Sequence, residues 1–136
     1  MATTTLLSNP VVTVNSVDLS DQCRSASLTV HYDELESTAF GTSSRSYVAG
    51  LGDHTLELEL YMSYAASETY ATLKDLVGTQ TTVIVKPAVG TDSATNPGLT
   101  LSGTFLSELP HMFTLGELSV ITITFRGGTY TADVTP

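Results

Sequence analysis

Apolar and polar residues alternate strictly over residues 55–62, where the sequence reads TLELELYM. Successive side chains of a strand point to opposite faces, so this pattern predicts a β-strand that is buried on one face. The three leucines would pack against a core, whereas Glu57 and Glu59 would lie on a polar face. A chain built around such a strand needs one apolar layer beneath it and leaves the other side for water or a polar partner.

Residues 26–33 alternate in the same way and predict a second strand, with Leu28 and Val30 on its apolar face. The polar positions of this strand are Ser27, Thr29 and His31. Consecutive strands usually pair, so we expect these polar positions to lie beside Glu57 and Glu59, above a shared core.

The remaining pattern is also typical of strands, with one helix. Ala66 to Val77 has helical spacing, with Ser67 as the expected N-cap and Gly78 as the stop. Asn15 and Ser16 indicate a turn after a short first strand, and residues 88–98 indicate a turn-rich loop. Further strands are expected at 11–14, 81–86, 99–107, 117–126 and 129–134.

The alternation of apolar and polar residues is absent between Glu34 and His54, where glycines lie among Ser and Thr. Loops of this length are uncommon in compact domains and are usually functional or disordered. Phe40, Tyr47 and Leu51 fall in this segment, and disordered linkers rarely hold such large apolar residues. We therefore interpret 34–54 as an extended hairpin or loop that becomes ordered against a partner.

Length and composition favour a single mainly β domain. The chain has 136 residues, which suits one domain at 11–136, preceded by a flexible arm at 1–10. Thr is abundant and is common in strands. The N-terminal residues lack the basic and apolar regions of a signal peptide, and no apolar run is long enough to cross a membrane.

The net charge of −9, with only 5 Lys and Arg, argues against tight binding to a phosphate backbone. One acidic cluster runs from Asp33 to Glu36. Two interpretations of this cluster stay open: it promotes solubility, or it pairs with a basic residue of a neighbouring subunit, such as Arg45.

The sequence contains no recognisable catalytic constellation. Cys23 is the only cysteine, which excludes an intrachain disulfide and indicates a buried, inert thiol. The three histidines have no metal-ligand spacing, and a lone histidine on a strand is more often a surface residue. Glu57 and Glu59 have a spacing compatible with a glycosidase pair, but a solvated face explains them better. We expect no enzyme activity, no metal and no cofactor.

Several stretches of the chain resemble a known protein family. The sequence from Val14 to Cys23, VNSVDLSDQC, resembles the start of small tail proteins of long-tailed bacteriophages. The alternating strand LTVHY, the acidic residues Glu34 to Glu36 and the following TAFG also resemble that family, as does an acidic strand before a short helix. The resemblance covers roughly residues 11 to 126. Asn15-Ser16 replaces the Asn-Gly that is common in the family.

The resemblance implies a tail tube protein, also called a major tail protein. Its implied fold has two packed antiparallel sheets, as a split barrel or sandwich, with one flanking α-helix and a long loop. Its implied assembly is a ring of six copies, stacked into a tube through which the genome passes without tight binding. The implied partners are other copies, the tape measure, the tail terminator and the distal tail protein, in a virion tail made in the host cytoplasm.

This hypothesis assigns roles to two sets of residues. The expected lumen lining is Glu57, Glu59, Ser27, Thr29 and His31. The expected contacts between subunits or rings, on the 34–54 loop, are Glu34, Glu36, Phe40, Arg45, Tyr47 and Leu51. Alternatives are a head-decoration or tail-completion protein, or a β-sandwich binding module for carbohydrate, which the absence of Trp disfavours.

Overall fold

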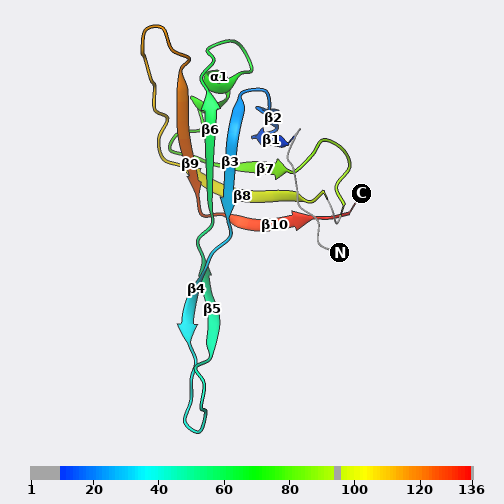
Figure 1. The fold of residues 1–136 in the computed structure, drawn as a ribbon, viewed down its shortest axis with the longest axis vertical. Helices are drawn as coiled ribbons and strands as arrows, with labels where there is room; N and C mark the ends of the chain where they lie inside the picture. Colours follow the sequence, from blue (N-terminus) through cyan, green and yellow to red (C-terminus); the bar gives the residue numbers. More distant parts are fainter. Residues whose placement is uncertain (1–9, 94–95, 136) are drawn as a thin grey trace.

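The computed structural model describes residues 10–93 and 96–135; the expected N-terminal arm therefore lies almost entirely outside the described residues. Figure 1 shows a strand-rich body from which a long hairpin projects along the longest axis of the molecule. The described chain contains ten strands and one helix. The strands of the body are β1 (Val11–Val14), β2 (Val17–Asp18), β3 (Cys23–Thr29), β6 (Thr55–Tyr61), β7 (Gln80–Lys86), β8 (Gly98–Leu106), β9 (Val120–Arg126) and β10 (Thr129–Asp133).

A single antiparallel sheet folds over to give the body its two layers. The strand order is β2-β1-β7-β8-β9-β6-β3, and β10 pairs with the other side of β8. The sheet bends where the last two residues of β8, Phe105 and Leu106, pair with Arg126 and Phe125 of β9. In Figure 1, β3, β6 and β9 run along the long axis, whereas β7, β8 and β10 cross behind them. The prediction of a mainly β, two-layered antiparallel fold with one helix is confirmed.

The core lies between these layers because alternate residues of each strand face inward. Leu56, Leu58 and Leu60 of β6 are all buried, as the sequence pattern predicts. Their neighbours in the core come from β9 and from the crossing layer: Ile121, Ile123, Phe125, Val12, Val14, Val83 and Leu101. Each fully buried side chain of this size stabilises the fold by roughly 1.5–3 kcal/mol.

The helix is shorter than expected. α1 spans Thr69–Leu73, whereas the sequence pattern predicts residues 66–77. Ser67 is not the N-cap, because its φ of 63° lies in the left-handed region; Glu68 is the N-cap and its side chain makes no capping bond. The buried hydroxyl of Thr69 instead donates to the Tyr61 carbonyl at 2.8 Å, which ties the start of the helix to the end of β6.

The predicted strand at 26–33 is two strands. β3 ends at Thr29, and β4 (Tyr32–Glu36) begins a separate two-stranded sheet with β5 (Tyr47–Gly52). The expectation that Val30 belongs to the core is therefore wrong: it lies where the chain leaves the body and is 42% exposed. The strand expected at 117–126 begins only at Val120.

The 34–54 segment is an extended hairpin, in agreement with the sequence interpretation. β4 and β5 pair with Leu35 opposite Val48 and Glu36 opposite Tyr47. Beyond the strands, the Ser37 N–H donates to the Ser46 carbonyl at 2.8 Å. The hairpin tip, residues 37–46, therefore continues the ladder before the chain turns back (Figure 1).

Candidate assembly surfaces

Three strands of the body, β3, β6 and β9, bring polar residues together on one face. Glu57 lies between Ser27 of β3 and Thr124 of β9 in the strand register, and Glu59 lies between Ser25 and Thr122. These positions point away from the buried leucines. We call this surface the polar face: Ser25, Ser27 and Thr29 of β3, Thr55, Glu57, Glu59 and Tyr61 of β6, and Thr122, Thr124 and Arg126 of β9.

Four of the five residues expected to share a lining lie on this face. Ser27, Thr29, Glu57 and Glu59 share it through the register of β3 and β6. His31 does not: it follows the end of β3, in the exposed link to the hairpin.

Charges of both signs occupy the polar face. Arg24 Nε lies 3.2 Å from Glu59 Oε1, and Arg126 Nη2 lies 3.3 Å from Asp53 Oδ2. Within the described residues Glu57 has no ion-pair partner. Sequence reasoning missed both arginines, although Arg126 continues the polar alternation of Thr122 and Thr124. Arg24 lies at an irregularity in the strand register between Cys23 and Ser25. The sequence pattern did not predict this irregularity.

The layer that carries the polar face has two free edges. β3 pairs only with β6, and β9 pairs with β8 through its last two residues alone; its Val120–Thr124 stretch pairs only with β6 in the described part of the chain. Unpaired strand edges are templates for pairing with another chain. Because both β3 and β9 are antiparallel to β6, these two edges run in the same direction.

Beside the β3 edge lies an apolar groove of about 520 Å³, between β3 and the crossing strands β1, β7 and β8. Cys23, Ala26 and Leu28 line one wall, and Val12 and Val85 line the other. Burial raises the pKa of the half-buried Cys23 thiol, which keeps it protonated and agrees with the expectation of an inert thiol.

The hairpin exposes large apolar side chains to solvent. Phe40 at the tip is fully exposed, and Leu51 is 81% exposed. Tyr32, Leu35, Tyr47 and Val48 are also exposed. The residues predicted as contacts, Glu34, Glu36, Phe40, Arg45, Tyr47 and Leu51, all lie on this hairpin and are all exposed. Arg45 forms no ion pair with any described residue, including the acidic residues of β4.

A buried histidine anchors the base of the hairpin. His54 is 2% exposed, so the expectation of a surface histidine is wrong at this position. Its Nδ1 accepts a hydrogen bond from the His31 backbone N–H at 3.2 Å. Its ring contacts Tyr32 edge-on at 5.1 Å and lies 5.9 Å from the ring of Tyr130. The hairpin is therefore fastened to β10 at its base, while its tip extends freely.

The loop between β8 and β9, residues 107–119, forms a second exposed apolar surface. Met112, Phe113, Leu115 and Leu118 are exposed there. The rings of Tyr64, His111 and Phe113 stack in series, and Tyr64 Oη lies 3.0 Å from His111 Nδ1. The sequence analysis did not predict this surface. The sequence feature that could have indicated it is the run of large apolar residues between Leu109 and Leu118, which lacks the alternation of a strand.

The described residues hold no group of three or more histidine, cysteine or carboxylate side chains placed to bind a metal ion. No helix in the described ranges is long and apolar enough to cross a membrane. The described residues form three notable surfaces: a polar face with two free edges, an exposed hairpin and an exposed apolar loop.

Comparison with protein families finds no match, and comparison with curated proteins finds none. Solved structures do match. A chain of the extended PVC sheath-tube complex, an extracellular contractile injection system, has a TM-score of 0.71 at 15% identity, covering 97% of this chain and 93% of that one. A chain of the PVC sheath/tube terminator has a TM-score of 0.71 at 14% identity, covering 98% and 99%.

A chain from the tail of an empty gene transfer agent particle, solved with C6 symmetry, has a TM-score of 0.62 at 10% identity. That match covers 85% of this chain and 83% of the other. The matched chains of the injection-system tube, its terminator and the gene transfer agent tail thus share their fold with 85–98% of this chain. The chain has a tail-tube-type fold.

Proposed function

We propose that this chain is a structural protein of a phage-like tail that assembles into stacked, six-membered rings and forms a tube for genome passage. The observation that carries the proposal is the polar face on a layer with two free edges. If β3 of one copy pairs with β9 of the next, both free strand edges become paired in a head-to-tail contact. Such a contact closes into a ring when the rotation between copies is a simple fraction of a turn.

The strand directions define the contact. β3 and β9 point the same way within one copy, so neighbouring copies around a ring axis would pair them in parallel. The six-fold tail of the gene transfer agent is a precedent for the ring number. This closure would also cover the apolar groove beside β3, which a lone copy leaves open to solvent.

In such a ring the polar face would line the lumen, with Ser27, Thr29, Glu57 and Glu59 toward the passing DNA and His31 near the rim. Phosphate backbones bind clustered Lys and Arg, and this chain carries a net charge of −9. Arg24 is paired with Glu59, and Arg126 with Asp53, so each of these two cations has a carboxylate beside it. The lining would let DNA slide without adhering.

The proposed partners are other copies of the chain and the tail proteins that meet the tube: the tape measure, the tail terminator and the distal tail protein. The proposed location is the virion tail, after synthesis in the host cytoplasm. No catalytic role is proposed. Residues Glu34, Glu36, Phe40, Arg45, Tyr47 and Leu51 would contact neighbouring subunits through the hairpin.

A second candidate function is that of a tube terminator, because one matched structure is a sheath/tube terminator with nearly complete coverage of both chains. A terminator would form a ring that does not stack on further copies of itself.

Electron microscopy of the purified chain at high concentration tests both candidates. We expect six-fold rings and stacked tubes, whereas single rings that never stack would favour the terminator. A chain that stays monomeric in sedimentation over a wide range of concentration and salt, and is missing from the tube wall of its particle, would contradict both.

A further inference from the structure

The core is left open beside the β3 edge. Cys23 and Leu28 pack against the core but are only half-buried, and Ala26 between them is exposed. All three line the groove of about 520 Å³, whose other wall holds Val12 and Val85. Apolar surface that stays open in this way marks a place where another segment packs.

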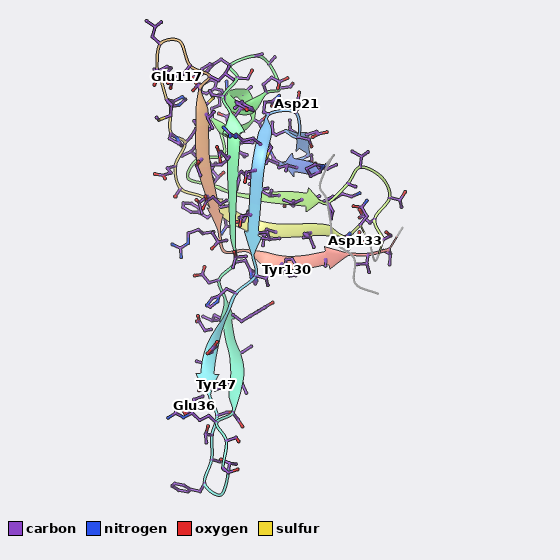
Figure 2. The ribbon with its side chains drawn as sticks, in the orientation of Figure 1. Asp21, Glu36, Tyr47, Glu117, Tyr130 and Asp133 are labelled. Atoms are coloured by element: carbon purple, nitrogen blue, oxygen red, sulfur yellow. The ribbon has the colours of Figure 1, made fainter. Side chains whose placement is uncertain are left out.

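The 107–119 loop is an apolar segment that needs such a cover. Its exposed large apolar side chains are Met112, Phe113, Leu115 and Leu118. In Figure 2, Glu117 marks this loop beside β9, and Asp21 marks the turn that enters β3. The loop and the groove therefore flank one layer, the loop beyond the β9 edge and the groove beside the β3 edge (Figure 1). Within one copy the strand β6 and its two neighbours separate them.

The groove and the loop lie at the same height along the strands. Cys23, at the start of β3, is paired with Leu60 of β6, and Val120, at the start of β9, is paired with the residue that follows Leu60. The Met62 N–H donates to the Ser119 carbonyl at 2.8 Å, which fixes the end of the loop at this level. A ring is generated by rotation about its axis alone. With these strands along that axis, the loop of one copy meets the groove of the next.

The charges of the two surfaces are complementary. The residues that line the groove include Arg24 and Lys86 and no carboxylate. Each of these cations has one carboxylate beside it, and that carboxylate lies outside the groove lining. The loop contains Glu108 and Glu117 and no Lys or Arg, and neither glutamate has an ion-pair partner among the described residues. Two loops in contact would oppose glutamates to glutamates, whereas a loop in the groove brings opposite charges together.

We infer that the 107–119 loop of one copy packs into the apolar groove of the next copy around the ring. The occupant is a second copy of this chain, because pairing of β3 with β9 brings these two surfaces together at one height. The contact closes the open margin of the core and buries the exposed side chains of the loop. It is head-to-tail, so each copy gives one loop and receives one.

This inference rests on the proposed ring and names the segment that seals its subunit contact. The competing occupant is the segment 1–9 of the same chain, because Pro10 also lines the groove.

The native thiol reports whether the groove is filled. Cys23 is the only cysteine and lines the groove, so its alkylation by N-ethylmaleimide at one fixed pH measures access to the groove. We expect alkylation in the dilute chain and a rate lower on the order of tenfold in rings or tubes. Equal rates in the two states would overturn the inference. Protection that is already complete in the dilute chain, and is lost on deletion of residues 1–9, would overturn it in favour of that segment.

A cross-link tests which segment fills the groove. Phe113→Cys or Leu115→Cys, each with the native Cys23, should give a ladder of disulfide-linked oligomers when assembled rings are oxidised. The ladder should vanish when Cys23→Ala is added, because each bond joins two different positions. Thr131→Cys is the matched control, because Thr131 is exposed but lies on β10, which runs on the groove side of the molecule (Figure 1). Rings in which neither loop variant gives a ladder would contradict the docking.

The outcomes separate this inference from the proposed function. Rings or tubes that form with a fully reactive Cys23, and with no ladder from either loop variant, would refute the docking and leave the proposed function standing. A wild-type chain that forms neither rings nor tubes would count against both. A ladder from the loop variants together with a protected Cys23 would support both.

Discussion

Arg24 Nε lies 3.2 Å from Glu59 Oε1 on the polar face, and the Arg24 guanidinium also lies 5.8 Å from the centre of the Tyr61 ring. Glu59 is therefore held and partly neutralised, whereas Glu57, two residues earlier on the same strand, has no ionic partner in the described part of the chain. Two carboxylates that look equivalent in the sequence thus have different electrostatic roles.

Reversing the charge at Glu57 should make the proposed lumen retain DNA. Glu57→Lys leaves the core untouched, and exposed substitutions of this kind usually change the free energy of unfolding by about 0.5 kcal/mol or less. We expect tails that assemble but eject DNA more slowly, with the slowing removed by added salt, since salt screens exposed charges. Ejection kinetics over a range of salt concentrations would measure this effect.

Glu59→Lys is the informative comparison. It removes the partner of Arg24 and adds a second cation beside it, so it should retain DNA more strongly than Glu57→Lys and cost more stability. Asp21→Lys, at an exposed carboxylate in the turn before β3, is the control. Ejection at the wild-type rate in both glutamate variants would show that these residues do not line the channel.

Truncation of Phe40 should separate assembly from folding. The side chain is fully exposed at the hairpin tip, so Phe40→Ala removes no contact within the body. Buried aromatic anchors at interfaces contribute about 2 kcal/mol or more to binding. We expect unchanged unfolding of the dilute protein and a clear loss of tubes, measured by denaturation and by sedimentation. Val89→Ala, at another exposed apolar side chain, should alter neither.

Hydrogen exchange offers an independent view of the same hairpin. Its backbone amides should exchange faster in the dilute protein than in tubes, because the strands pair only with each other before assembly. Equal protection of residues 34–54 in both states would contradict the proposed role of the hairpin.

The sequence predicted the parts of the fold that follow from period-two alternation. Leu56, Leu58 and Leu60 are buried where the pattern puts them, and Glu57 shares a face with Ser27 through the expected pairing of β3 with β6. The pattern could not show where the chain leaves the body. Val30 and Tyr32 continue the alternation of β3, yet the sheet ends at Thr29 because the hairpin starts there.

Long-range contacts explain the other features that the sequence did not predict correctly. His54 is buried because Tyr32 and Tyr130, distant in sequence, close around its ring. The helix is short because the backbone of Ser67 is left-handed and Thr69 bonds to the end of β6. The aromatic stack joins Tyr64, before the helix, to His111, in a loop after β8. None of these contacts leaves a local pattern.

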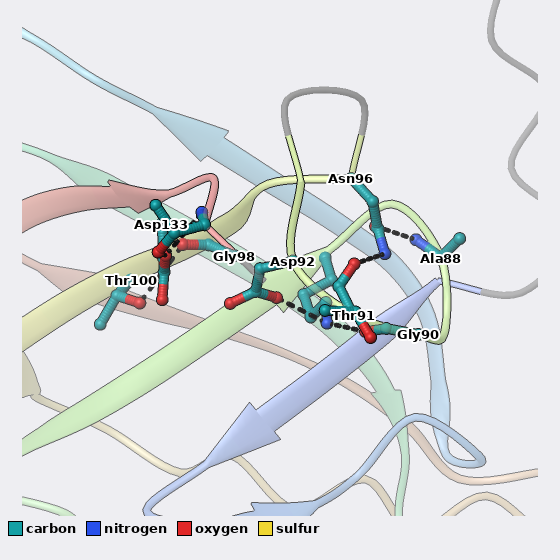
Figure 3. Close-up of polar contacts among 10 residues, drawn as sticks. Ala88, Gly90, Thr91, Asp92, Asn96, Gly98, Thr100 and Asp133 are labelled. Carbon is teal, nitrogen blue, oxygen red and sulfur yellow. Dashed lines mark hydrogen bonds and ion pairs between the residues drawn. The ribbon is translucent and has the colours of Figure 1, made fainter.

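The C-terminal end of β10 should respond to acid. Figure 3 shows Asp133 near the loop after β7, where the Ala88 N–H donates to Asn96 Oδ1 at 3.1 Å. The Thr135 backbone N–H and then its hydroxyl donate to Asp133, at 3.1 and 2.9 Å, and these bonds lower the pKa of the Asp133 carboxyl. The positive charge of nearby Lys86 lowers this pKa further.

A lowered pKa in the folded state means that the carboxylate form is the favoured partner of Thr135. The contact is therefore complete above the ordinary aspartate pKa and is lost as the pH falls through the lowered value. Thr135→Ala removes the hydroxyl donor and should raise the pKa of Asp133 part of the way back. Carboxyl NMR titration measures this change, and Thr131→Ala on the exposed side of β10 is the control. An Asp133 pKa that does not move in Thr135→Ala would disprove the assignment.

The turn from β9 to β10 gives the sharpest test of the fold, because two adjacent glycines differ in what surrounds them. Gly127 and Gly128 both have positive φ, at 75° and 90°. A Cβ on Gly127 would meet nothing within 4 Å, whereas one on Gly128 would lie 2.6 Å from the backbone oxygen of Ser102. Backbone atoms of β8 cannot swing aside as a flexible side chain can. Gly127→Ala should therefore cost only the left-handed strain of a non-glycine residue, about 1 kcal/mol.

Gly128→Ala should cost more, about 3 kcal/mol, because β10 must also shift away from β8. Urea unfolding of the dilute protein measures the difference as a lower midpoint at an unchanged slope. The shift would disturb the pairing of Thr129 with Ser102 and of Tyr130 with Leu101, and with it the ring that packs on His54. Gly128→Ala should therefore also loosen the base of the hairpin, seen as faster amide exchange at His31. Equal destabilisation by the two substitutions would mean that the close approach of this turn to β8 does not exist in solution.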